Sequence, residues 1–391
     1  MATQTVYPAT HIIVGTKAQF IKMAPIARLL EERGWPYRVL DLGQHGSITP
    51  GIVRDFGLQP DQIHVIPWDS TVASYGQALR WAGALVARIA SPRKRLTRDL
   101  LMRPAGHALI HGDTLSTLFG LHLARRLGLR VGLVEAGLSS GNCLDPFPEE
   151  MIRRHVEKRA DFLFAPDHAS ADCLKERGLK GKVINTEYNT GRDALLLIAS
   201  LHAEKTRSVP TFRTVLTLHR AETISHMGRL CSIMNHVIGL APNIGPIRFY
   251  LHEPTRRALV RGRLMKQLQD SEHFQLCPLG SYPEFTGDLV RAKYILTDGG
   301  SIQEEASYIN KRCLILRRRT ERGHGLGETA MLASMNIESD LQFLLDDERT
   351  ANRDSQWVAT LKAPARILQA LYPAGSVTTP SALDTAALGH D

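Results

Sequence analysis

Four carboxylates follow strand-like apolar runs in the first half of the chain. Asp113 lies in HGDT, Glu135 in VEAG, and Glu149 and Glu150 in the loop-like PFPEE. Segments that follow the strands of a parallel sheet meet at one edge of that sheet, so these side chains can converge. Each one alone fits a cap or a turn. Together they fit general acid/base chemistry, the removal or donation of a proton, as well as they fit a structural role.

A glycine-rich segment in the second half could bind phosphate. Asp298-Gly299-Gly300-Ser301 follows a strand-like run and precedes a helix that we expect to begin near Ile302. Glycines let the backbone approach a ligand, and the amides at a helix N-terminus attract anions. Ser301 and Glu304 also fit a capping box, which needs no ligand. Two glycines at a strand end are more than a cap requires, so the pattern favours phosphate binding, with Glu305 placed to accept hydrogen bonds from ribose hydroxyls.

Two further segments have related features. The strand-like run His11 to Val14 is followed by Gly15 to Ala18 and by a helix that carries Lys22. No G-x-G-x-x-G is present, so a nicotinamide or flavin dinucleotide is not indicated and we expect no cofactor. His219 and Arg220 directly follow another strand-like run. A lone histidine is usually structural, but this one has the position that a catalytic histidine would need.

The elements that must position these residues alternate between short aliphatic runs and helical patterns. This alternation predicts an α/β fold with two Rossmann-like, doubly wound parallel sheets. We place the domains at residues 1–205 and 206–372, followed by a disordered tail at 373–391. Ligands bind at the carboxyl ends of such strands, so we expect the site in a cleft between the two domains. The expected strands are His11 to Val14, Tyr37 to Leu42, Ala108 to His111, Val131 to Glu135, Phe162 to Ala165, Thr214 to Leu218, Ile247 to Leu251, Phe274 to Cys277, Tyr294 to Thr297 and Cys313 to Leu316.

Composition limits the class of protein. The 391 residues are 43% hydrophobic and 22% charged, which are globular values that suffice for two cores. Five cysteines without metal-ligand spacing indicate neither a disulfide framework nor a metal site. We see no secretory leader and no apolar run long enough for a membrane span, so we expect a cytoplasmic protein with no membrane partner. The net charge of +9 is spread along the chain, which suits a phosphate-bearing small molecule, and we expect no nucleic-acid partner.

Seven motifs occur in a fixed order between about Ile13 and Ala330: GTKAQFIKMAP, HGDT, VEAGL, PFPEE, LHRAE, DGGSIQEE and RTERGHGLGE. In this order they resemble the UDP-N-acetylglucosamine 2-epimerase family. The resemblance implies a fold of the glycosyltransferase-B type, in which two Rossmann-like domains close over a nucleotide sugar. It also implies a homodimer, a UDP-sugar substrate and a role in supplying precursors of surface polysaccharides.

The resemblance also implies roles for individual residues. The positions that the family uses for catalysis hold Asp113, Glu135, Glu149 and His219. Those that contact substrate hold Lys17, Lys22, Arg153 and Arg322 as cations, Gly300, Ser301 and Glu305 at the diphosphate and ribose, Phe285 by the uracil, and His252. The chain departs from the family pattern at Lys17, usually arginine, at Ala18-Gln19, usually Pro-Glu, and at Gly299 and Ser301, usually serine and glycine. Lysine keeps the charge of arginine but loses its bidentate fork.

The hydrogen on carbon 2 of an N-acetylhexosamine is not adjacent to a carbonyl, so simple deprotonation is implausible. We expect elimination of UDP to a glycal and re-addition from the other face, which requires a base, an acid and cations for the departing diphosphate. A hydrolysing relative that releases N-acetylmannosamine and UDP would use the same groups. A glycosyltransferase of the same fold, a non-catalytic nucleotide-sugar sensor and an RNA-binding protein are weaker alternatives.

Overall fold

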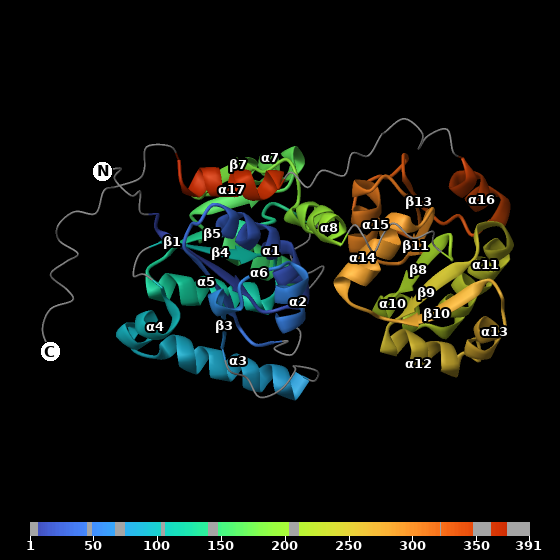
Figure 1. Ribbon diagram of the computed structural model, residues 1–391, viewed down its shortest axis with the longest axis horizontal. Helices are drawn as coiled ribbons and strands as arrows, with labels where there is room; N and C mark the ends of the chain where they lie inside the picture. The colour runs from blue at the N-terminus through green and yellow to red at the C-terminus, as the bar shows by residue number, and fades with distance from the viewer. Residues whose placement is uncertain are drawn as a thin grey trace, which may run out of the picture. The chain divides into compact units, whose positions relative to one another are not determined.

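The computed structural model describes residues 7–44, 49–66, 75–102, 106–139, 148–202, 211–320, 322–346 and 361–373. The chain forms two compact units, which we treat separately (Figure 1). The first unit comprises Met1–Leu197 and Ala359–Asp391, and the second comprises Ile198–Val358. Among the described residues, no helix combines the length and the apolar character needed to cross a membrane.

The first unit is built on a seven-stranded parallel sheet with the order β3-β2-β1-β4-β5-β6-β7. Its central strands are almost wholly buried because helices cover both faces of such a sheet. The strands are β1 (Ala9–Val14), β2 (Tyr37–Asp41), β3 (Ile63–Val65), β4 (Gly106–His111), β5 (Arg130–Val134), β6 (Phe162–Ala165) and β7 (Lys182–Asn185). The helices are α1 (Lys17–Glu32), α2 (Thr49–Asp55), α3 (Tyr75–Ala90), α4 (Arg93–Leu100), α5 (Leu115–Leu127), α6 (Glu149–Glu157), α7 (His168–Glu176), α8 (Thr190–Leu201) and α17 (Lys362–Leu371), with a 3-10 turn at Pro60–Gln62.

The second unit repeats this plan with a six-stranded parallel sheet in the order β10-β9-β8-β11-β12-β13. The strands are β8 (Thr214–Leu218), β9 (Ile247–Leu251), β10 (Phe274–Pro278), β11 (Tyr294–Thr297), β12 (Arg312–Ile315) and β13 (Ala330–Leu332). The helices are α10 (Ala221–Ile224), α11 (Met227–Ile244), α12 (Glu253–Arg261), α13 (Met265–Gln269), α14 (Tyr282–Arg291), α15 (Gly300–Tyr308) and α16 (Ile337–Leu345). In both sheets the strand order reverses beside the first strand, which is where doubly wound sheets bind ligands.

The predicted fold class is confirmed, and all ten predicted strands are present within one or two residues at each end. Three strands were not predicted, namely β3, β7 and β13. Each lies at a sheet edge, has only three or four residues, and is largely half-buried or exposed. An edge strand of this kind lacks the apolar run by which the other strands could be recognised.

The end of the chain departs from the predicted division into domains. We assigned residues up to 372 to the second domain, but α17 packs on α1 in the first unit (Figure 1). The Asp193 carboxylate in α8 accepts hydrogen bonds from the amides of Lys362 and Ala363 at the start of α17. The Tyr372 hydroxyl donates to the carbonyl of Pro8. The predicted link near residue 205 and the predicted tail beyond residue 373 lie outside the described residues.

Candidate active site

One glutamine joins the two loops at the point where the strand order of the first sheet reverses. Gln19 is 3% exposed, and its Oε1 accepts hydrogen bonds from the amides of Gly15 at 3.0 Å and Thr16 at 3.2 Å, just after β1. Its Nε2 donates to the carbonyl of His111 at 2.7 Å and to two threonine hydroxyls near the start of α5. The loops after β1 and β4 are therefore held together by a single side chain. Sequence analysis did not assign a role to Gln19, because only the tertiary fold brings these loops into contact.

Glu135 follows β5 and carries a strained backbone. Its φ is 64°, a left-handed conformation that costs a residue other than glycine roughly 1 kcal/mol or more. The nearly buried carboxylate lies 2.5 Å from Nζ of Lys22 and 2.8 Å from Nε2 of His111, both measured to Oε2. The structure thus brings together two predicted site residues, Glu135 and Lys22. It adds His111, which the sequence had indicated only as the last residue of a strand.

A second network surrounds Asp113. Arg153 donates through Nη2 to the Asp113 carboxylate and through Nη1 to Glu150. Glu150 is fully buried and also accepts from Oγ of Ser139 at 2.9 Å and from Nε of Arg154 at 3.1 Å. Arg153, predicted to contact substrate, is therefore engaged with two carboxylates. Glu150 orients this arginine.

Glu149 is the first residue of α6. Its Oε2 is buried and has no hydrogen-bond partner within the described part of the chain. Buried carboxylate oxygens are nearly always paired, so an unpaired one is expected to meet a proton or a ligand. Glu149 is thus the one predicted catalytic carboxylate of this unit whose side chain is not tied to a basic group among the described residues.

In the second unit, His219 is held by Asp298 where the strand order reverses. The fully buried Asp298 carboxylate accepts from the amide of His219 at 3.0 Å and from that of Arg220 at 3.0 Å. The ring of His219 stacks on that of His252 with centroids 5.1 Å apart. Burial lowers the pKa of His219, and the nearby Asp298 charge opposes this shift only in part. The imidazole is therefore mainly neutral near pH 7 and can both accept and donate a proton.

The helix after β11 presents its N-terminus without a side-chain cap. α15 begins at Gly300 with Gly299 as its N-cap residue, so the start predicted near Ile302 was two residues late. The alternative interpretation of Ser301 and Glu304 as a capping box does not apply, because Ser301 lies within the helix. A Cβ on Gly299 would lie 2.5 Å from Cε1 of His219, so a larger residue here would require the histidine ring to move. An uncapped helix N-terminus beside a histidine can bind a phosphate group.

Side chains of α15 contact the neighbouring segments of the second unit. Arg322 pairs with Glu304 at 2.7 Å, and Gln303 donates to the carbonyls of Arg322 and His324, which fixes the segment after β12. The Tyr282 hydroxyl bonds Glu305, and burial followed by the Glu305 charge raises the pKa of Tyr282 well above its usual range.

A family model described as UDP-N-acetylglucosamine 2-epimerase matches residues 38–372. The chain belongs to this family. The UDP-N-acetylglucosamine 2-epimerase of Salmonella borreze is 30% identical over 365 residues, which cover 88% of this chain and 92% of that protein. The UDP-2,3-diacetamido-2,3-dideoxy-D-glucuronate 2-epimerase of Pseudomonas aeruginosa is 28% identical over 317 residues, covering 79% and 83%. The structure of UDP-GlcNAc 2-epimerase from Neisseria meningitidis bound to UDP-GlcNAc matches with a TM-score of 0.74 and 25% identity, covering 93% and 99%.

The remaining residues predicted to contact substrate have the following places in this member of the UDP-N-acetylglucosamine 2-epimerase family. Lys17 is the first residue of α1 and is partly exposed. Phe285 is 8% exposed and packs edge-on against Tyr250, with ring centroids 5.0 Å apart, so most of its ring belongs to the core. Ser301 is exposed in the first turn of α15. No group of His, Cys, Asp or Glu among the described residues could hold a metal ion.

The second unit also contains a pocket of about 670 Å³. It is lined from α10, α11 and the segment after β12, with Glu222, Arg229 and Arg317 among its polar groups. None of the predicted site residues lines it.

Proposed function

We propose that the protein is a non-hydrolysing 2-epimerase that interconverts UDP-GlcNAc and UDP-ManNAc without a cofactor. Membership of the 2-epimerase family supports the substrate class. The observation that carries the proposal is the cluster of Lys22, Glu135 and His111, in which a strained backbone directs a nearly buried carboxylate onto two basic groups. Strain retained at such a position is typical of functional sites.

The proposed route is elimination followed by re-addition. A carboxylate removes the proton from carbon 2, the electrons of that bond form the carbon 1–carbon 2 double bond, and the bond from carbon 1 to the UDP oxygen breaks. UDP then adds back to carbon 1 of the glycal while carbon 2 is protonated from the opposite face. Glu135, Asp113 and Glu149 are the proposed acid and base groups, and His219 is the proposed second-unit partner.

We propose that the second unit binds the UDP portion. The N-terminus of α15 at Gly300 and Ser301 would receive the diphosphate, because its dipole and first-turn amides favour negative charge. Glu305 would accept hydrogen bonds from the ribose hydroxyls, and Phe285 would lie by the uracil. Lys17, Lys22 and Arg322 would supply positive charge for the departing diphosphate.

Incubation with UDP-GlcNAc in heavy water tests this proposal. We expect UDP-ManNAc that carries deuterium at carbon 2, because the abstracted proton exchanges with solvent before carbon 2 is reprotonated. Free N-acetylmannosamine with UDP would instead identify a hydrolysing enzyme. Inversion with retention of the original hydrogen would exclude the elimination route.

A second candidate substrate is a diacetamido uronic acid derivative, favoured by the similarity to the Pseudomonas aeruginosa enzyme. Comparing kcat/KM for UDP-GlcNAc with that for UDP-2,3-diacetamido-2,3-dideoxyglucuronate decides between the two substrates. The preferred one should be turned over at least tenfold more efficiently.

We propose that the enzyme acts as a cytoplasmic homodimer without a metal. The four cysteines that the structure describes are all free thiols, as expected in a reducing compartment.

Leu79 and Val86 on α3 are 59% and 57% exposed and offer an apolar contact for a second copy. Light scattering should show a dimer that L79D/V86D converts to a monomer, and a chelator should leave turnover unchanged. A wild-type monomer, or activity restored only by a divalent ion, would contradict this proposal.

A further inference from the structure

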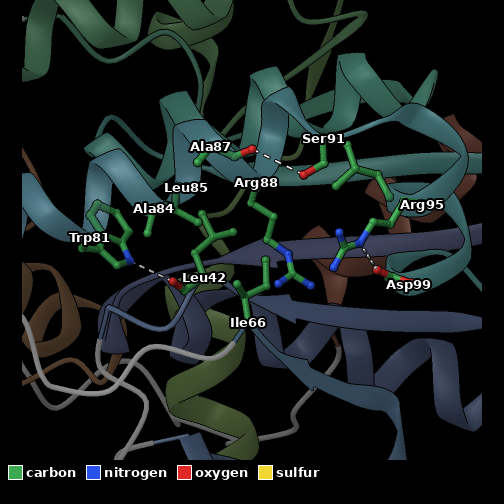
Figure 2. Close-up of a pocket in the computed structure, with 11 residues that line it drawn as sticks. Leu42, Ile66, Trp81, Ala84, Leu85, Ala87, Arg88, Ser91, Arg95 and Asp99 are labelled. Atoms are coloured by element: carbon green, nitrogen blue, oxygen red, sulfur yellow. Dashed lines mark hydrogen bonds and ion pairs between the residues drawn. The ribbon is translucent and has the colours of Figure 1, made fainter.

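The first unit contains a pocket that none of the proposed site residues lines. It has a volume of about 380 Å³ and lies among α3, α4 and the segments that follow β2 and β3 (Figure 2). A volume of this size falls within the range of small-molecule sites.

One wall of the pocket is apolar and firmly built. It consists of five buried side chains, Leu42, Ile66, Trp81, Leu85 and Leu96. The indole Nε1 of Trp81 donates to the carbonyl of Leu42 at 2.8 Å, which ties α3 to the end of β2 (Figure 2). This side of the pocket is therefore apolar and fixed in position.

The opposite part of the pocket is cationic. Arg88 extends from α3 into the pocket, and Arg95 lines it from α4 (Figure 2). Nε of Arg88 is buried and has no hydrogen-bond partner in the described part of the chain, and no described carboxylate lies within ion-pair distance of this guanidinium. The one acid that lines the pocket, Asp99, lies 3.7 Å from Arg95 and 3.3 Å from Arg98 instead.

The neighbouring His64 adds no positive charge beside Arg88. Burial, followed by the positive charges of Arg38 and Arg88, lowers the pKa of His64, so this residue is neutral at physiological pH. Its Nε2 is buried and, among the described residues, also lacks a hydrogen-bond partner. Arg88 therefore remains an uncompensated, partly desolvated cation beside an apolar wall, which is an arrangement that favours an anion.

We propose that this pocket binds a small organic anion at a site separate from that of the nucleotide sugar. The ligand places an aromatic or branched apolar body against Trp81, Leu85 and Leu96 and one carboxylate, sulfonate or phosphate on Arg88. Arg95 is more exposed and lies 3.7 Å from Asp99, so Arg88 supplies the unpaired positive charge.

The probe for this site is 2-naphthoate, and its matched neutral analogue is 2-naphthalenemethanol. Titration calorimetry should show saturable binding of 2-naphthoate with Kd below about 1 mM, and at least tenfold weaker binding of the alcohol. Saturating UDP should not displace the probe, so the result is independent of the proposed catalytic function. Crystals soaked with the probe should show it between Trp81 and Arg88.

Variants on one helix locate the binding. Arg88→Gln should weaken binding of 2-naphthoate at least tenfold, and Ala84→Phe should abolish it by filling the pocket. Arg80→Gln removes an exposed arginine of α3 outside the pocket and should leave binding unchanged. A thermal midpoint within 2 or so degrees of wild type would show that each variant is folded. Equal affinity for acid and alcohol, full binding by Arg88→Gln, or no binding at several millimolar would each overturn the proposal.

Discussion

Nζ of Lys22 lies 2.5 Å from Oε2 of Glu135, although the two residues belong to different elements and are separated by more than 100 positions. α1 positions the lysine, and the turn after β5 positions the glutamate. The same carboxylate oxygen is 2.8 Å from Nε2 of His111. These two contacts fix the position of the carboxylate at the end of β5, and a group that transfers protons must be held in this way.

Changing Glu135 to glutamine should therefore lower turnover far more than UDP affinity. The amide keeps the shape of the side chain but cannot take up a proton at neutral pH. We expect kcat to fall by roughly 10²- to 10⁴-fold, with the Kd for UDP within about twofold of wild type. Glu176→Gln, an exposed substitution on α7, is the matched control and should retain full activity. Asp113→Asn and Glu149→Gln complete the series, and near-wild-type turnover in all three amides would refute the site assignment.

Asp298→Asn tests whether the segment that carries His219 must be held by a carboxylate. Asparagine has one acceptor atom, which in the Oδ2 position could still accept from the amides of His219 and Arg220 at 3.2 and 3.0 Å. Its amino group would then face the N–H of His219 in place of Oδ1, so that two donors oppose each other. This should destabilise the protein by roughly 1–3 kcal/mol and displace the histidine. The urea midpoint and kcat of Asp298→Asn should both fall, whereas His219→Gln should lower kcat but not the urea midpoint. A wild-type urea midpoint for Asp298→Asn would contradict the proposal that Asp298 holds this segment.

The sequence predicts the central strands and the carboxylate-bearing segments because both depend on local patterns. Residues 108–110 in β4 and 131–134 in β5 are apolar runs, and Asp113 and Glu135 lie within three residues of their ends. The contacts that His111, Gln19 and Asp298 make could not be predicted from the sequence. Each joins two chain segments that are distant in the sequence, and no spacing rule connects such segments. The same applies to α17, whose N-terminus is held by Asp193 about 170 residues earlier.

Gln19 offers a test of one departure from the family pattern. Glutamate, which the family usually has here, could accept from the amides of Gly15 and Thr16 but could not donate to the carbonyl of His111. We expect Gln19→Glu to destabilise the protein at neutral pH. Burial and the carbonyl should raise the pKa of the new carboxyl, so the folded state would bind the additional proton and the deficit should shrink as the pH falls.

Gln19→Leu is the companion variant. It leaves the amides of Gly15 and Thr16 unsatisfied at every pH, whereas the carbonyl of His111 still accepts from the Thr117 hydroxyl. Its loss of stability, roughly 2–5 kcal/mol, should therefore not depend on pH. Urea midpoints measured at about pH 5 and pH 8 distinguish the two variants. Equal stability of Gln19→Leu and wild type would show that the loops after β1 and β4 do not depend on this side chain.

Glu305→Ala should weaken UDP binding by the loss of charge-assisted hydrogen bonds, on the order of 1.5–3 kcal/mol or about 10- to 150-fold in Kd. Glu305→Gln removes the charge but retains an acceptor for the Tyr282 hydroxyl. Its Kd should show whether the weaker UDP binding comes from the lost charge of Glu305 or from altered packing of Tyr282. Glu272→Ala, an exposed substitution in the same unit, serves as control. Calorimetry with UDP measures all three, and wild-type affinity in Glu305→Ala would exclude a ribose contact.

Two buried histidines should make the first unit sensitive to acid. Burial is the main cause that lowers the pKa of His11 and of His107 to about 4, with smaller contributions from Arg38 and Arg130 respectively. Between about pH 6.5 and pH 4 the unfolded chain therefore binds more protons than the folded one, so stability is lost as the pH falls through this range. Each histidine can account for up to roughly 3 kcal/mol.

Replacing one of these histidines by an aromatic residue that cannot be protonated tests this expectation. The ring of His107 contacts those of Phe162 and Tyr372 edge-on, so His107→Phe keeps the aromatic packing. The difference in thermal midpoint between about pH 7.5 and pH 5 should be smaller in His107→Phe than in wild type, because less proton uptake accompanies unfolding. His168→Phe alters an exposed histidine of the same unit and should leave that difference unchanged. If His107→Phe loses as much stability on acidification as wild type, another group is responsible for the acid sensitivity of this unit.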